Sequence, residues 1–354
     1  MKVKTYILKK SLIVLMLLQA VSIYSTKKQD DMSYFYIDFQ SAYYPPNALG
    51  TYCGGESKFS PSFITPQFES VIPEEQISPS FWGAIKTISH LGYNTSFKLF
   101  NDPNSLLFKD NKVTMDFKIG LSPVTALLKG KIYFTPIAFI NLYAGIELGL
   151  GWQAFGFKGT GVHIGDGQYS KNVEFYTEIT VGGGRLQFDL NAIFDGDWTH
   201  IITVIGNDVM YINNPQANYN QLWKHNADEG KNINGFIILP YAALIYKMPL
   251  FSFNMIGLLY EGKTYIGYAR KISTIQNKGW GSDFFYHNLS FVTKFKIIEN
   301  LDLDLLLKFS TAPIYTADTN GISDISKRIA TGNSYIYYDS IGLSLNYKFG
   351  LHPN

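Results

Sequence analysis

The sequence contains only one cysteine, Cys53, among 354 residues. A single thiol cannot form an internal disulfide, and it lacks the spacing that metal-binding cysteines show. Charged residues are also scarce: Asp, Glu, Lys and Arg make up 16% of the chain, against about a quarter in typical globular domains. The formal net charge is +2, and there is no block of basic residues of the kind that binds nucleic acid. A disulfide scaffold and a nucleic-acid-binding protein are therefore not expected.

Long apolar runs are absent beyond the N-terminus. Residues 1–25 contain four lysines, a short apolar core at 12–18 and small residues at 20–22, which predicts a cleaved secretory signal peptide. An uncleaved anchor is the alternative, but the core is shorter than the roughly 20 apolar residues of a membrane-spanning helix. Residues 26–354 are expected to form one domain. Open sheet edges cannot face lipid, so this domain would cross a membrane only as a closed sheet.

Apolar and polar residues alternate in many segments. At 300–310 the odd positions from Leu301 to Phe309 are apolar, and the even positions are polar except Leu306. A period of two indicates a β-strand with two different faces. Segments 34–40, 113–121, 140–152 and 289–297 show the same pattern, with Val292 as a further exception. Repeated alternation over about ten residues is typical of membrane-spanning β-barrels.

Aromatic residues make up 16% of the chain. Tyr and Trp concentrate at the two interfaces of a membrane. We therefore expect Trp152, Tyr246, Trp280, Tyr337 and Tyr347 to lie in an interfacial belt rather than in a sugar-binding site.

Turn residues divide the chain into these strands. Alternation on both sides of Gly182–Gly184 predicts a hairpin that turns at the glycines. Long loops are expected at 44–79, 153–170, 206–233, 272–283 and 314–333. Long loops that alternate with short turns match the two sides of an outer-membrane barrel. The predicted fold is all-β, a transmembrane antiparallel up-and-down β-barrel of about 12 strands, with 10 to 14 possible.

The charged residues of the strands fall on the faces opposite the apolar residues. Ions are costly in lipid, so these faces are expected to line the lumen. The predicted lumen-lining residues are Asp38, Asp116, Lys118, Glu147, Glu174, Glu178, Arg185, Asp189, Lys294, Lys296, Asp302, Asp304, Lys308 and Lys348. Both signs occur in similar numbers. Two interpretations stay open: the charges line a channel, or they pair across strands and fill a narrow barrel.

No segment matches a catalytic, cofactor-binding or metal-binding motif. His200, close in sequence to Asp195 and Asp197, is the best local cluster, and a position on a loop surface is favoured over catalysis. We expect neither an enzyme nor a bound cofactor or metal.

The final strand, 335–349, has a recognisable pattern. Ser340, Gly342, Leu345 and Tyr347 follow the order polar, glycine, hydrophobic, aromatic. This segment resembles the terminal β-signal of bacterial outer-membrane β-barrels, the class that includes the porins. The resemblance implies insertion by the barrel assembly machinery and location in the outer membrane, among its lipids.

The function expected from these patterns is a passive, porin-like channel or transporter for small solutes. One alternative is a plugged structural or surface-binding barrel that uses its long loops. A less favoured alternative is a barrel hydrolase. Nucleic acid is not an expected partner.

Overall fold

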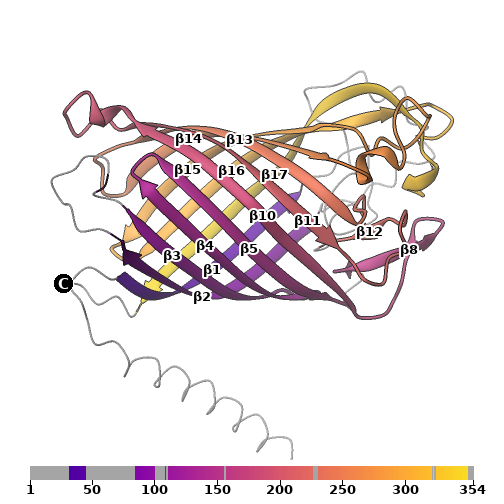
Figure 1. The fold of residues 1–354 in the computed structure, drawn as a ribbon, viewed down its shortest axis with the longest axis horizontal. Helices are drawn as coiled ribbons and strands as arrows, with labels where there is room; N and C mark the ends of the chain where they lie inside the picture. Colours follow the sequence, from indigo (N-terminus) through magenta and orange to yellow (C-terminus); the bar gives the residue numbers. More distant parts are fainter. Residues whose placement is uncertain are drawn as a thin grey trace, which may run out of the picture.

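A closed antiparallel β-barrel dominates the computed structural model of the chain (Figure 1). The structure describes residues 32–44, 84–99, 108, 111–154, 157–225, 230–320, 322 and 324–349. The predicted signal peptide, Cys53 and nearly all of the predicted loop 44–79 lie outside these residues. No helix in the described part of the chain is long and apolar enough to span a membrane.

Twelve strands form the barrel, and each is antiparallel to its neighbours. In chain order they are β1 (Met32–Tyr44), β2 (Ala84–Lys98), β3 (Lys112–Leu121), β4 (Thr125–Ile137), β5 (Ile140–Gly151), β10 (Glu174–Asp189), β11 (Ile201–Asn213), β13 (Gly235–Lys247), β14 (Phe253–Tyr265), β15 (Tyr286–Ile298), β16 (Leu301–Tyr315) and β17 (Ala330–Phe349). Each strand pairs with the next one along the chain, and β17 closes the barrel against β1. The expected fold, an antiparallel up-and-down barrel of about 12 strands, is confirmed.

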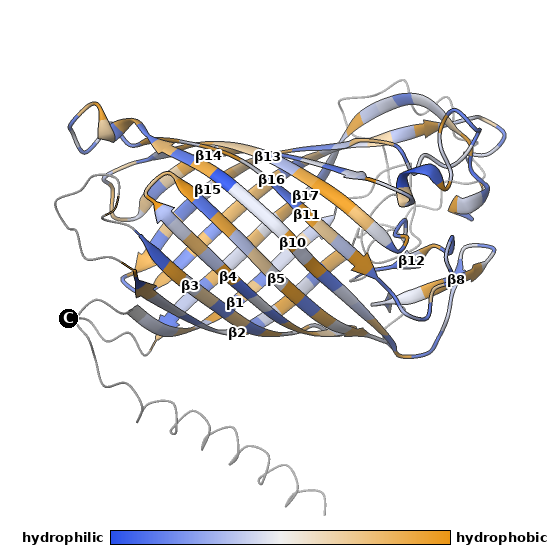
Figure 2. Ribbon diagram, viewed as in Figure 1, coloured by the Kyte–Doolittle hydropathy of each residue, from blue (hydrophilic) through white to orange (hydrophobic). Residues whose placement is uncertain are grey.

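The alternation of the sequence becomes the two faces of this wall. In β1, Ile37 is 48% exposed and Phe39 37%, whereas Asp38 between them is 6% exposed. Large apolar side chains are exposed on each of the twelve barrel strands, and orange and blue residues alternate along the ribbons in Figure 2. Successive side chains of a strand point to opposite faces. The apolar residues therefore cover the outside of the barrel, and Asp38 lies on its inner face.

The predicted hairpin at Gly182–Gly184 is wrong. These glycines lie inside β10, which continues through them to Asp189. The pairing register shifts between Thr180 and Gly183, and this bulge exchanges the two faces: Val181 points outward before it, and Leu186 points outward after it. An extra residue in one strand reverses its alternation, so one bulged strand looks like two strands joined by a turn.

The connections differ strongly between the two ends of the barrel. At one end most of them are short, such as 138–139, 248–252 and 299–300, and 190–200 is longer. At the other end most of them are long, such as 152–173, 214–234, 266–285 and 316–329, and 122–124 is short. Two expected loops were too long, because 206–213 belongs to β11 and 330–333 to β17. The end of the barrel with mostly short connections is the short-turn end, and the opposite end is the long-loop end.

The long loops fold into small elements at their end of the barrel (Figure 1). The short strands are β6 (Gln153–Ala154), β7 (Phe157–Lys158), β8 (Gly161–Gly165), β9 (Gln168–Tyr169) and β12 (Trp223–Lys224), and the 3-10 helices are η3 (Leu190–Ala192, at the short-turn end), η4 (Ala269–Lys271) and η5 (Ile325–Lys327). Strands β12, β8 and β9 form one sheet. An apolar core beneath them contains Trp223, Ile233 and Trp280.

The prediction that Trp280 and Tyr337 lie in an outer aromatic belt is wrong, since their side chains are buried at 4% and 5% exposure.

Candidate functional site

Polar side chains line a large part of the inner face of the barrel. Strands β1 to β5 and β10 present mainly charged and hydroxyl side chains to the interior, among them Asp116, Lys129 and Tyr143. Hydrogen bonds and ion pairs connect these groups across strands.

Asp38 and Asp116 are held in separate polar networks. The Asp38 carboxylate accepts hydrogen bonds from Gln40 (2.6 Å) and from Ser344 on β17 (2.9 Å), and His90 Nδ1 lies 3.4 Å away. The Tyr36 hydroxyl donates to Asp116 (2.9 Å). The bond between Asp38 and Ser344 crosses the β1–β17 seam, so it ties the two ends of the sheet together.

A second group of predicted residues forms an ion-pair chain on β15, β16 and β17. Lys294 Nζ lies 3.3 Å from Asp302 and 3.7 Å from Asp304. Lys348 Nζ lies 3.9 Å from the same Asp302 oxygen. Two lysines and two aspartates leave this group without net charge. Lys308 on β16 is 3.9 Å from Asp339.

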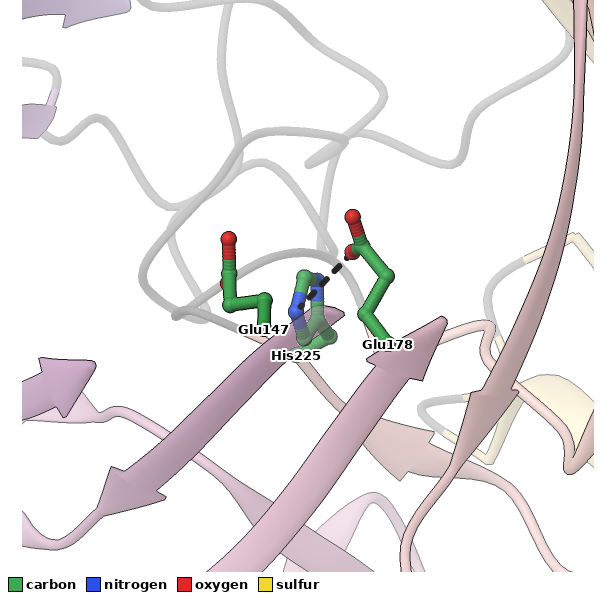
Figure 3. Close-up of side chains that lie close together, drawn as sticks. All are labelled: Glu147, Glu178 and His225. Carbon is green, nitrogen blue, oxygen red and sulfur yellow. Dashed lines mark ion pairs between the residues drawn. The ribbon is translucent and has the colours of Figure 1, made fainter. Parts of the chain in front are cut away.

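The densest cluster joins β5, β10 and the loop that carries β12. The Glu147 carboxylate accepts hydrogen bonds from Lys129 Nζ at 2.8 Å and from the Tyr176 hydroxyl at 2.7 Å. His225 Nε2 lies 3.7 Å from Glu178, and the three side chains Glu147, Glu178 and His225 converge in Figure 3.

Glu147, Glu178 and His225 carry the ligand types of a metal centre. One ligand atom from each lies within 4.8 Å of the others. A carboxylate that already pairs with Lys129 at 2.8 Å would have to give up that cation to bind a metal. The ion pairs of Glu147 with Lys129 and of His225 with Glu178 account for the cluster.

The same cluster contacts the loop between β11 and β13 at the long-loop end of the barrel. The rings of His225 and Tyr176 meet edge to face at 4.4 Å. Trp223, two residues earlier, is 0% exposed and pairs with Val162 of β8. Tyr176, Met210 and Tyr265 of three barrel strands belong to the same apolar core as Trp223. Residues 214–225 and 230–234 of this loop therefore pack onto the barrel strands at the long-loop end.

The other predicted residues lie apart from these clusters. Glu174 is buried and accepts hydrogen bonds from Ser170 and from Asn214. Asp189 lies at the short-turn end, where it pairs with His200 at 2.8 Å. His200 thus faces Asp189 rather than Asp195 or Asp197, which are exposed. Lys118, Arg185 and Lys296 make no ion pair with any residue that the structure describes.

Several inner residues were not anticipated. Lys129 and Lys131 alternate with Leu128, Gly130 and Ile132, so the period of two in segment 126–134 contained this signal. Asp208, which accepts a hydrogen bond from Tyr143, lies in a segment that was expected to be a loop. His225 comes from a loop, and no sequence pattern points to it.

Part of the interior is open. Gln40 and Gln187 are exposed, although each lies on the inner face by strand alternation. A cavity of about 550 Å³ adjoins Gln40, Lys86, Lys294 and Leu306. Exposed polar groups on the inner face show that side chains do not fill the whole lumen.

Comparisons with known proteins find similarity only among solved structures. No family model matches the chain, and no curated protein matches its sequence. The KdgM porin is similar over 89% of this chain and 99% of its own, at 8% identity and a TM-score of 0.34. The outer membrane channel DcaP of Acinetobacter baumannii is similar over 91% of this chain and 99% of its own, at 9% identity and a TM-score of 0.32. The translocator domain of autotransporter NalP from Neisseria meningitidis is similar over 98% of both chains, at 8% identity and a TM-score of 0.33.

Proposed function

We propose that the chain is an integral outer-membrane β-barrel and that small solutes pass through its lumen. The membrane assignment is supported by the exposed apolar side chains that surround the barrel and by the charged side chains of the strands, which lie on its inner face. A soluble barrel would expose polar groups on its outside, whereas lipid requires an apolar surface there. The short turns and the two terminal strand ends would face the periplasm, and the long loops the exterior.

The observation that favours passage is the solvent-exposed polar lining of the lumen. Gln40 and Gln187 lie on the inner face of opposite parts of the wall, and both are exposed. The charges nearby are largely compensated, as in the group that pairs Lys294 and Lys348 with Asp302 and Asp304. Such a lining screens solutes by size more than by the sign of their charge.

The apolar core at the long-loop end favours a second candidate, a plugged barrel that binds partners through its loops. Trp223 and Ile233 are both 0% exposed in this core. In the channel proposal the same core is a constriction, through which only small solutes pass.

Conductance in planar lipid bilayers separates the two candidates. The refolded protein, with its β-sheet content checked by circular dichroism, is added to the bilayer at 1 M KCl. We expect discrete, small ion steps. Absence of steps from inserted, folded protein would exclude the channel and leave the plugged barrel.

Assembly is proposed to depend on the last strand. Leu345 and Tyr347 lie on the outer face of β17, where Tyr347 is 42% exposed, and Ser340 and Gly342 lie on the inner face. A Tyr347→Ser variant is expected to reach the outer membrane in smaller amounts in cells while refolding normally in detergent. Equal loss in both assays would mean that Tyr347 contributes to folding and not to recognition.

The variant His200→Ala tests the hydrolase alternative, which predicts a hydrolytic activity that this change abolishes.

A further inference from the structure

The two exceptions to strand alternation meet inside the barrel. Val292 and Leu306 occupy inner positions on β15 and β16, where the neighbouring inner residues are Ser290, Lys294 and Lys308. They are direct cross-strand partners, and both adjoin the cavity of about 550 Å³. An apolar pair on the inner wall has no lipid to face, so it exposes apolar surface to the lumen.

This pair is part of a longer row. Direct partners in neighbouring strands continue it in both directions. The row runs through Ile245, Gly257, Val292, Leu306, Gly342 and Ala42. Direct partners on antiparallel strands have Cβ atoms about 4.5–5.5 Å apart. The six positions therefore form a continuous apolar stripe across six adjacent strands, and the two glycines in it leave room beside the larger side chains.

A single uncompensated cation stands at the end of this stripe. Lys86 on β2 is the direct partner of Ala42, and it adjoins the same cavity. It forms no ion pair within the described part of the chain. The other charged groups at the cavity, Lys294 and Asp304, lie 3.7 Å from each other. The cavity thus offers an apolar wall with one positive charge in excess.

We infer that this stripe binds an amphipathic anion with an aliphatic body and one carboxylate. The aliphatic body would lie against Val292, Leu306 and Ala42 and remove their surface from water, and the carboxylate would bind Lys86 Nζ. The cavity volume falls within the roughly 300–1,000 Å³ of small-molecule sites. This inference rests on the proposed function, because it gives the chemical class of solute for the proposed passage.

Binding of octanoate tests the inference without requiring conduction. Labelled octanoate is measured by equilibrium dialysis against the barrel in phospholipid nanodiscs, with empty nanodiscs subtracted. Unlabelled acetate and octan-1-ol serve as competitors. We expect saturable octanoate binding that both competitors displace much more weakly than unlabelled octanoate, since one lacks the apolar body and the other the charge.

Two sets of variants locate the site. The double change Val292→Thr with Leu306→Asn is expected to weaken octanoate binding about tenfold. Its control is Val204→Thr, an inner-face change on β11 away from the cavity. Lys86→Gln is expected to weaken octanoate about tenfold while leaving competition by octan-1-ol unchanged. Its control is Lys271→Gln, which removes the same charge from an exposed loop.

The outcomes separate this inference from the proposed function. Absence of saturable binding, or binding that the folded cavity variants leave unchanged, would overturn the inference. Ion steps without octanoate binding would overturn the inference alone and leave the channel. Binding without ion steps would support the site and overturn the channel.

Discussion

Val292 and Leu306 face each other across β15 and β16 on the inner wall of the barrel. In the sequence each is an isolated break in a pattern, separated by 13 residues. In the structure they are one apolar surface, placed between the ion pair of Lys294 and Asp304 on one side and Ser290 and Lys308 on the other. A break in alternation therefore produces an apolar surface on the inner wall when its cross-strand partner breaks the pattern too.

The neighbours Leu305 and Leu306 give a direct test of which face meets lipid. Leu305→Lys places a charge on the outer face, where Lys at the bilayer midplane costs about 2–4 kcal/mol. Leu306→Lys places the same charge in the lumen, where water reaches it. We expect urea unfolding in phospholipid vesicles to show a loss of about 2–4 kcal/mol for the first variant only. Equal losses for both would contradict the assigned faces.

The constriction at the long-loop end gives a prediction about conductance. Trp223→Ala removes a fully buried side chain from the apolar core at the long-loop end. Such a large-to-small change in a core lowers the free energy of unfolding by about 3–5 kcal/mol. Loosening of the loop 214–234 should raise the single-channel conductance or the open fraction. Trp198→Ala is the control, because Trp198 is 55% exposed in the connection after η3 at the short-turn end. An unchanged conductance in Trp223→Ala would show that this core does not limit the passage.

The strands of the barrel and their outward faces could be predicted from the sequence, but the bulge in β10 and the contacts of the loops could not. Alternation follows from the pleat and needs only local information, so the outward positions of strands such as β3 and β5 could be predicted. The bulge at Gly182–Gly184 could not, because it is a property of the pairing with the neighbouring strands β5 and β11. The ring of Tyr143 on β5 lies against Gly183, where a Cβ would be 2.2 Å from it. The position of His225 depends on packing of a loop against β10, and no local pattern encodes such a contact.

Glycines beneath inner tyrosines provide a packing prediction. A Cβ on Gly149 would lie 2.1 Å from the ring of Tyr176, whereas a Cβ on Gly342 would meet Leu306 Cβ at 3.5 Å, an ordinary contact. Gly149→Ala should push away Tyr176, whose hydroxyl bonds Glu147, and cost about 1–3 kcal/mol. Gly342→Ala should cost less than about 1 kcal/mol. Urea unfolding of the two variants checks this order, and the reverse order would mean that Tyr176 has room to move.

The contact between two long loops should depend on pH. Asp324, next to η5, lies 3.5 Å from His163 of β8 and 3.5 Å from Lys327, and Lys327 also reaches Asp166 at 3.1 Å. Burial opposes ionisation of Asp324, but hydrogen bonds from Ser326 and the nearby positive groups outweigh it and hold the pKa of this carboxyl below its ordinary value.

A carboxyl with a depressed pKa in the docked loops stabilises docking above its ordinary pKa, and this stabilisation is lost as the pH falls through the depressed value. We expect amide hydrogen exchange in 161–165, corrected for the intrinsic effect of pH, to speed up as the pH drops below the ordinary pKa of an aspartate, near 3.8. Asp324→Asn should already exchange faster at neutral pH and lose this acid dependence. Asp318→Asn, which changes an exposed acid of the same loop, should behave like the wild type. If Asp324→Asn kept the acid dependence of the wild type, another group would control the contact between the loops.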